Sequence, residues 1–307
     1  MNKLYFFLFL IACFTTSCFY FEKNNENINN ENLVNLGKKF FFDTRLSKNN
    51  TKSCATCHAP QFAFTDGYRK SSGIYADETK RNAPTLLNSR FLKSLTWADD
   101  VKDYQTQMLK PLFAEHPKEM GLNPNDIEVL RRFQNDSTYE FLFKKAYKKN
   151  IQRLDYQNII NAISAYENTL VSFESNFDKG NFGSEIGKNL FFSKKLQCSN
   201  CHTPPLFTNG KKAKSFISEN DNGFFDKTKN KNDLGKFRVP TLRNIELTAP
   251  YMHDGSVEQL ENAIQHDFFD KKNKKTNPKM DKNEVLQIMF FLKSLTDSSI
   301  FVKKQFL

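Results

Sequence analysis

The chain has 307 residues, a length that suits one large domain or two small ones. Hydrophobic residues make up 39% and charged residues 26%, which excludes wholesale disorder and allows a packed core. The formal net charge of +11 would attract an acidic redox partner or anionic lipid. Lysine pairs are scattered rather than gathered into one stripe and no nucleic-acid-binding motif occurs, so we expect no nucleic-acid partner.

The first residues have the pattern of an export signal. Lys3 is followed by an apolar stretch over residues 4–12, which is too short to span a membrane. Small and hydroxyl-bearing residues then lead to Cys18, and lipoprotein processing recognises a cysteine in this position. We therefore expect a signal over residues 1–18 and a periplasmic protein anchored to a membrane only through lipidated Cys18. Lipidation at Cys13 and a cleaved signal without lipid are the alternatives.

The rest of the chain is predicted to be mainly α-helical, with little β structure. Residues 19–32 include an Asn- and Glu-rich tract that indicates a flexible tether. Apolar residues recur at helical spacing in three later segments, at 33–41, 159–173 and 285–295. Pro, Asn, Asp and Lys predict loops at 203–205, 220–232 and 269–278.

Four of the six cysteines form two C-x-x-C pairs, and a histidine directly follows each pair. The two strings are Cys54-Ala55-Thr56-Cys57-His58 and Cys198-Ser199-Asn200-Cys201-His202. C-x-x-C-H is the attachment pattern of c-type haem, because two thiols bond to the two vinyl groups of one porphyrin and the next histidine reaches the iron. We therefore predict two covalently bound haem c groups, with His58 and His202 as iron ligands.

Three other interpretations of the cysteines compete with haem attachment. Disulfides suit an exported protein but do not explain the histidine after each pair. Zinc sites use C-x-x-C pairs that usually lie closer together in sequence than these. A thioredoxin-like motif would occur once, at the start of a helix. Two C-x-x-C-H motifs in one exported chain favour two haems.

The haem motifs belong to a larger internal repeat. Residues 37–42 (Gly-Lys-Lys-Phe-Phe-Phe) precede the first motif, and residues 187–192 (Gly-Lys-Asn-Leu-Phe-Phe) precede the second. Residues 81–88 (Arg-Asn-Ala-Pro-Thr-Leu-Leu-Asn) similarly match residues 238–244 (Arg-Val-Pro-Thr-Leu-Arg-Asn). The repeat predicts two tandem haem domains, over residues 33–178 and 179–307.

The order of motifs resembles that of bacterial di-haem cytochrome c peroxidases and MauG-like proteins, over nearly all of the chain after residue 33. Besides the repeat, it includes Phe64-Thr65-Asp66-Gly67, Trp97, Glu119-Met120-Gly121 and Thr248-Ala249-Pro250-Tyr251-Met252-His253-Asp254-Gly255. Residues 95–99 and 294–297 look closer to the branch of MauG-like enzymes associated with methanobactin copper peptides. The resemblance implies two tandem cytochrome c-like domains, the first of which reacts with peroxide.

The resemblance also implies roles for single residues. His58 becomes the proximal ligand of the reactive haem, and Gln107 and Glu119 match the pair that handles peroxide on its distal side. A carboxylate suits this role because O–O cleavage requires a proton to move from one oxygen to the other. Trp97 matches a tryptophan that conducts electrons between the haems; a core tryptophan with a bonded N–H is the alternative. Calcium is a further expected cofactor, since positions that hold it between the domains are matched by Asn82, Thr248 and Pro250.

Two departures from the family pattern concern the sixth iron ligands. Family members that need reductive activation carry a distal histidine between the first haem motif and Asn82, but residues 59–81 contain neither His nor Met. Ile74 falls near that place, which predicts an open position at the first haem; Tyr68 or Tyr75 entering the site is the alternative.

At the second haem, the family's usual Met or Tyr ligand is missing from residues 265–268, which read Gln-His-Asp-Phe. His266 is therefore our first candidate for the sixth ligand. Met280, Met252 or an iron without a sixth ligand are the alternatives, and His253 is expected near this haem without binding the iron.

The leading functional hypothesis is an enzyme that reduces hydrogen peroxide to water at the N-terminal haem. Electrons would pass through the C-terminal haem and Trp97 from a periplasmic donor, either a small cytochrome c or a copper protein. A MauG-like enzyme that oxidises residues of a partner protein and a non-enzymatic di-haem electron carrier are the alternatives. A homodimer is one possible assembly.

Overall fold

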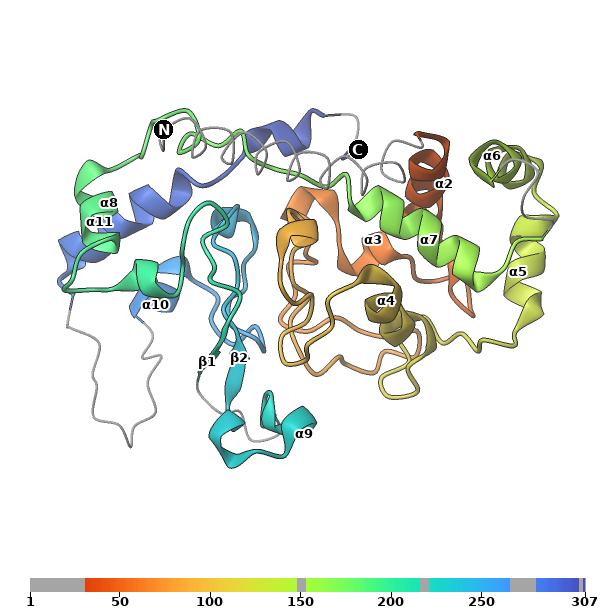
Figure 1. Ribbon diagram of the computed structural model, residues 1–307, viewed down its shortest axis with the longest axis horizontal. Helices are drawn as coiled ribbons and strands as arrows, with labels where there is room; N and C mark the ends of the chain where they lie inside the picture. Colours follow the sequence, from red (N-terminus) through yellow and green to blue (C-terminus); the bar gives the residue numbers. More distant parts are fainter. Residues whose placement is uncertain (1–30, 148–152, 216–220, 266–279, 304–305, 307) are drawn as a thin grey trace, which may run out of the picture.

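The computed structural model describes residues 31–147, 153–215, 221–265, 280–303 and 306. Within these residues it forms two lobes side by side, built from ten α-helices and one two-stranded sheet (Figure 1), which confirms the mainly α prediction. The helices are α2 (Glu31–Phe42), α3 (Cys54–Cys57), α4 (Tyr104–Phe113), α5 (Ile127–Gln134), α6 (Ser137–Tyr147), α7 (Tyr156–Glu167), α8 (Glu185–Phe191), α9 (Phe225–Thr228), α10 (Leu260–Gln265) and α11 (Lys282–Lys293). The antiparallel strands are β1 (Lys212–Lys214) and β2 (Lys236–Arg238).

Several predictions lie outside the described residues. They are the export signal with Cys13 and Cys18, nearly all of the tether, His266 and the predicted loop at 269–278. Among the described helices, none is both long enough and apolar enough to cross a membrane.

Each lobe is built on a crossing of two helices that a glycine makes possible. In the first lobe α2 packs against α7 at Gly37, where an added Cβ would lie 1.8 Å from the carbonyl oxygen of Ala162. In the second lobe α8 packs against α11 at Gly187, where an added Cβ would lie 1.9 Å from the carbonyl oxygen of Gln287. The repeated Gly-Lys sequence therefore encodes the same close packing of helices twice.

Two of the sequence predictions need correction. The apolar stripe predicted helix as far as residue 173, but α7 ends at Glu167. Leu170 is still buried in the core, although the chain around it has turned away from the helix axis to enter the crossing described below. The predicted loop over residues 220–232 contains the short helix α9.

Two clusters of buried hydrophobic side chains form the cores. The first gathers residues of α2, α4, α5, α6 and α7, and it also takes in Ile300 and Phe306 from the end of the chain. The second contains Phe191, Phe207, Ile288, Phe291, Leu292 and Leu295. Phe207 meets Phe177 edge to face at 5.1 Å between ring centroids, so phenylalanines supply much of this core. The domain boundary at residues 178 and 179 stays a prediction.

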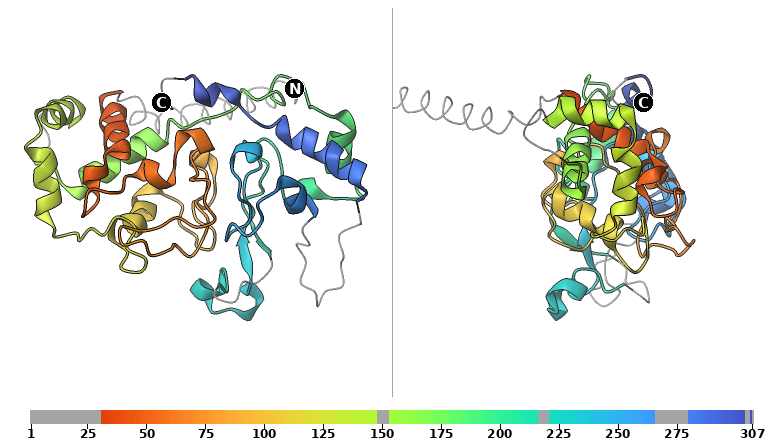
Figure 2. Two further views of the ribbon diagram at one scale, coloured as in Figure 1. Left: turned by 180° about the vertical axis from the view of Figure 1, so that it is seen from behind. Right: turned by 90° about the vertical axis from the view of Figure 1, so that its right-hand side faces the viewer.

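Two segments cross between the lobes in opposite directions. Residues 168–184 run from the first lobe to the second, and residues 294–303 return beside them, as the view from behind also shows (Figure 2). The backbone N–H of Phe177 donates to the carbonyl of Ser294 (2.9 Å), which joins the two segments.

Candidate haem-binding sites and the boundary between them

The first C-x-x-C-H motif forms the short helix α3. The backbone N–H of His58 donates to the carbonyl of Cys54 (2.9 Å), which closes one helical turn. Both motif cysteines are half-buried free thiols. The turn places the two thiols one helical turn apart with the histidine next to them, as the attachment chemistry requires.

The His58 ring is held through its Nδ1, which lies 3.0 Å from the carbonyl oxygen of Phe64. Burial lowers the pKa of His58, so the ring is neutral at neutral pH, and a neutral imidazole is the form that binds a metal. Bonding at Nδ1 leaves Nε2 as the nitrogen for the iron. The Phe64 carbonyl sits in a tight turn, since Phe64 has a φ of 60°, and Thr85 Oγ1 fixes this turn by donating to the Ala63 carbonyl (2.5 Å).

The second motif repeats each of these contacts. The N–H of His202 donates to the Cys198 carbonyl (2.9 Å), and His202 Nδ1 lies 3.1 Å from the carbonyl oxygen of Phe207. Phe207 has a φ of 53°, and Thr241 Oγ1 donates to the carbonyl of Leu206 (2.5 Å). Burial again lowers the pKa of the histidine. The residues at both motifs therefore fit one c-type haem each.

Glu119 lies in the segment that follows α4. The N–H of Met120 donates to the Pro111 carbonyl (3.0 Å), so the Glu119 segment is tied to the end of the helix that carries the half-buried Gln107. Burial raises the pKa of Glu119 above its ordinary value, and the negative charge of Asp77 raises it further. The structure thus brings the Glu119 segment to the end of α4, and the roles of Gln107 and Glu119 as a distal pair stay a prediction.

The loop around Ile74 packs directly against the Glu119 segment. The N–H of Ile74 donates to the Lys118 carbonyl (2.9 Å), and the N–H of Lys118 donates to Asp77 Oδ2 (2.8 Å). Ile74 is 8% exposed. Tyr68 and Tyr75, the alternative ligands, are 69% and 67% exposed, so packing does not hold either ring in the site. The open position at the first haem stays a prediction.

Asp77 is a residue that sequence reasoning missed. Its Oδ1 is buried and has no hydrogen-bond partner among the described residues. It lies 42 positions before Glu119 in the sequence, and no motif links the two carboxylates. Only the folded loop shows that the Asp77 charge adds to burial in raising the pKa of Glu119.

Trp97 lies where the two lobes meet. Its Nε1 donates to the carbonyl of Asn82 (2.9 Å) in the first lobe, and its own carbonyl accepts from the N–H of Arg238 (2.7 Å) in the second. Asn82 lies two residues before Pro84, whose carbonyl contacts His58. In the same way, Arg238 lies two residues before Pro240, whose carbonyl contacts His202. The indole therefore lies between the backbone segments that support the two histidines.

The predicted calcium residues come from two segments that meet. The N–H of Asn82 donates to the carbonyl of His253 (2.9 Å), which joins Asn82 to the segment carrying Thr248 and Pro250. Within the described residues, no group of three or more His, Cys, Asp or Glu could hold a metal ion. Calcium therefore stays a prediction that depends on backbone, amide and hydroxyl oxygens.

The sixth ligand of the second haem also stays a prediction. His266 lies outside the described residues. Among the alternatives, Met280 packs against the same hydrophobic cluster as Cys198, and Met252 is half-buried with a φ of 75°. His253 is buried, and its ring stacks on Phe237 with 3.7 Å between the ring centroids.

A tandem pair of haem-binding lobes, each with a C-x-x-C-H motif and a histidine fixed by a backbone carbonyl, defines a two-haem c-type cytochrome. The sequence profile for the di-haem cytochrome c peroxidases matches residues 31–185. Cytochrome c551 peroxidase of Nitrosomonas europaea is 36% identical over 87% of this chain and 80% of its own length. Methylamine utilization protein MauG of Methylorubrum extorquens is 30% identical over 76% of this chain and 67% of its own length.

Among solved structures, a MauG-like protein associated with microbial copper homeostasis superposes with a TM-score of 0.84 at 33% identity, covering 90% of this chain and 93% of that one. The chain therefore belongs to the di-haem cytochrome c peroxidase family, whose members are haem-containing oxidoreductases.

The threonines that fix the two histidine-supporting turns give a matched test. Thr85→Val and Thr241→Val each remove a hydroxyl that donates to a carbonyl and accepts from a backbone N–H (Leu87 and Arg243). We expect each to lower the free energy of unfolding by about 1–3 kcal/mol, because both backbone groups lose their partner. Urea unfolding of the haem-loaded protein measures this, with exposed Thr138→Val as the control. Equal stability of Thr85→Val and the control would contradict the assignment.

Proposed function

We propose that this protein reduces hydrogen peroxide to water at its N-terminal haem, with electrons delivered through the C-terminal haem and Trp97. The donor is a small cytochrome c or a copper protein of the periplasm. The observation that carries the proposal is the half-buried Glu119, whose pKa is raised. The loop that packs against its segment carries Ile74 and contains no histidine that could block the iron. This arrangement favours a site that admits peroxide and can move a proton in it.

The bound haem supplies the iron at which peroxide exchanges electrons. The remaining chemistry is proton transfer, because reducing one peroxide to two waters consumes two electrons and two protons. The Glu119 carboxylate takes the proton from one peroxide oxygen and returns it to the other, which becomes the leaving water. Gln107 orients the peroxide through its amide, and burial together with the Asp77 charge keeps the pKa of Glu119 raised.

Electron delivery depends on the boundary between the lobes. Trp97 bonds to the first lobe through its N–H and to the second through its carbonyl, which places an oxidisable ring between the supports of the two histidines. The same contacts satisfy the alternative reading of Trp97 as a core residue with a bonded N–H. We propose electron transfer through Trp97 because its ring lies between the two lobes.

A second candidate function is the oxidation of residues of a partner protein. It is favoured by the likeness to a MauG-like protein associated with copper homeostasis and by Ile74, which leaves no histidine to gate the first haem. Both candidates share the reaction with peroxide and differ only in the electron donor. A simple electron carrier is disfavoured, because it has no use for a carboxylate with a raised pKa beside the haem.

The setting of the enzyme is proposed on the sequence alone. Export, a lipid on Cys18 and a periplasmic location follow from the N-terminal pattern. A calcium ion near Asn82, Thr248 and Pro250 and a homodimeric assembly also belong to the proposal.

Replacing Glu119 tests the proposed proton transfer. Glu119→Gln keeps the size of the side chain but cannot accept the proton, so we expect the rate constant for peroxide reduction to fall about 10²–10⁴-fold. Steady-state assays with a reduced small cytochrome and a reduced copper protein measure the rate. Exposed Glu115, four residues away and paired with Lys118, gives the control Glu115→Gln. A full rate in Glu119→Gln with normal haem content would contradict the proposal.

The pH dependence of the same reaction tests the role of Asp77. Because the carboxylate form of Glu119 is needed and its pKa is raised, the rate should fall as the pH drops through that raised pKa. Asp77→Asn removes a negative charge and therefore lowers the pKa of Glu119. We expect the acidic limb of the rate profile to move to lower pH, with the plateau rate retained. An unmoved limb would show that Asp77 does not act on Glu119.

A further inference from the structure

Arg238 at the end of β2 is a buried cation with no neutralising partner among the described residues. It is 3% exposed, its Nε donates to the carbonyl of Thr96 (3.1 Å), and its Nη1 is buried without a hydrogen-bond partner. Within the described part of the chain, Arg238 forms no ion pair with a carboxylate. Burial lowers the pKa of Arg238 to about 10, so the side chain still carries its charge at neutral pH.

Other inward-facing arginines near the lobe boundary differ from Arg238 in this respect. Arg243 is 2% exposed and makes two bonds to the Asp178 carboxylate, of 2.6 and 2.8 Å. Arg81 makes two bonds to the buried Asp221, of 2.8 and 2.9 Å. Leaving a buried charge without a counter-ion strongly destabilises a folded protein. The buried guanidinium of Arg238 is therefore suited to bind an anion.

The surroundings of Arg238 identify the anion. Arg238 lies two residues before Pro240, and the Pro240 carbonyl contacts the ring of His202. The group attached at the second motif would thus lie close to the guanidinium, and a c-type haem carries two carboxylates. A guanidinium and a carboxylate are matched in charge and geometry. Their pair is strongest when two buried N–H groups of the guanidinium donate to the two carboxylate oxygens.

We propose that Arg238 binds a carboxylate of the C-terminal haem and acts as its counter-ion at the boundary between the lobes. The inference rests on haem attachment at the second motif and not on peroxide reduction. The guanidinium also lies 5.7 Å from the centroid of the Trp97 ring. Arg238 is therefore a positioning residue that joins a haem carboxylate, the Trp97 ring and the Thr96 carbonyl in one set of contacts.

The pair has a measurable electrostatic consequence. A positive charge beside a haem favours the reduced iron, which carries one positive charge fewer, so Arg238 should raise the midpoint potential of the C-terminal haem. Arg238→Gln should move this potential to a more negative value, and Arg238→Lys should move it less because the charge is kept. Redox titration of the haem-loaded protein, with the two haems followed separately by electron paramagnetic resonance, gives both potentials without adding peroxide.

Lys212 provides the matched control. It faces Arg238 across the β1–β2 ladder, but its amino group is already paired with Asp100. Lys212→Gln removes one positive charge from the same strand pair and should move the potential less than Arg238→Gln does. Resonance Raman spectra add a direct readout, since the bending band of the haem carboxylates changes when their hydrogen bonds change.

In Arg238→Gln we expect the midpoint potential of the C-terminal haem alone to become more negative and the bending band of the haem carboxylates to change. Unchanged potentials in Arg238→Gln at wild-type haem content, or a shift of the N-terminal haem alone, would overturn the proposal. If Arg238→Gln fails to accumulate, the carboxylate band of Arg238→Lys decides, and a band identical to that of the wild type would overturn it. Failure of peroxide reduction would leave these readouts unaffected, so the two proposals are tested independently.

Discussion

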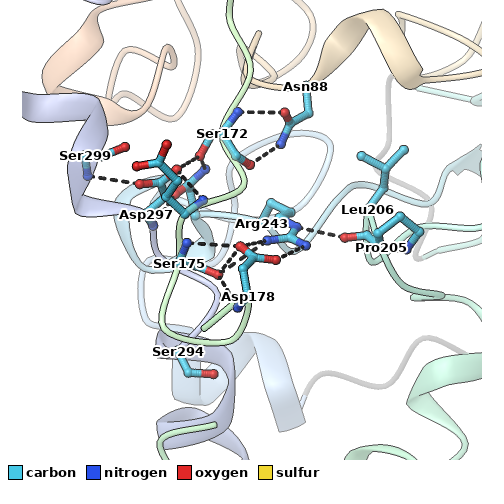
Figure 3. A network of polar contacts seen from close by, with 12 residues as sticks. Asn88, Ser172, Ser175, Asp178, Pro205, Leu206, Arg243, Ser294, Asp297 and Ser299 are labelled. Carbon is cyan, nitrogen blue, oxygen red and sulfur yellow. Dashed lines mark hydrogen bonds and ion pairs between the residues drawn. The ribbon is translucent and has the colours of Figure 1, made fainter. Parts of the chain in front are cut away.

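A buried hydrogen-bond cluster at the crossing of the two lobes supports the rest of the structure (Figure 3). Asn88, Ser172, Asn244 and Asp297 are each 1% exposed. The Asp297 carboxylate accepts from Ser172 Oγ (2.9 Å) and from the N–H groups of Glu174 and Ser299 (3.0 Å each). These donors lower the pKa of Asp297 although burial opposes its ionisation. Asn88 bonds the backbone of Ser172 and Asn244 accepts from the N–H of Asp297, so one cluster anchors both repeated Pro-Thr segments.

This anchoring reaches the two histidines through short chains of contacts. From Asn88 it is three residues back to Thr85, which fixes the turn whose carbonyl bonds His58. From Asn244 it is three residues back to Thr241, which fixes the turn whose carbonyl bonds His202. The two lobes share this support but differ in what surrounds it. In the first lobe the half-buried Glu119 packs with the Ile74 loop, to which we assign the proton chemistry; in the second, we assign the buried Arg238 to a haem carboxylate. On our proposal, these different side chains on a common backbone frame give the two haems different tasks.

The sequence predicted the features that depend on short spacing. C-x-x-C-H defines the attachment sites within five residues, and the repeated glycines mark the two helix crossings. Features that depend on distant partners could not be predicted. The charge of Asp77 acts on Glu119 from 42 positions away, and Ile300 and Phe306 return to the first core from the end of the chain. No local pattern records these relations, nor that Arg238 is buried without an acidic partner among the described residues. The end of α7 was misplaced because Leu170 keeps the apolar spacing of the helix while being buried by the crossing instead.

The most direct test of the account is stopped-flow absorption of the as-isolated protein, with both haems ferric, mixed with a small excess of hydrogen peroxide. Because residues 59–81 contain no histidine that could gate the first haem, we expect the Soret band to change rapidly without any prior reduction. No change until one haem has been reduced would reveal a ligand at the first haem and contradict the open site. No change in either state would contradict peroxide chemistry at this haem altogether.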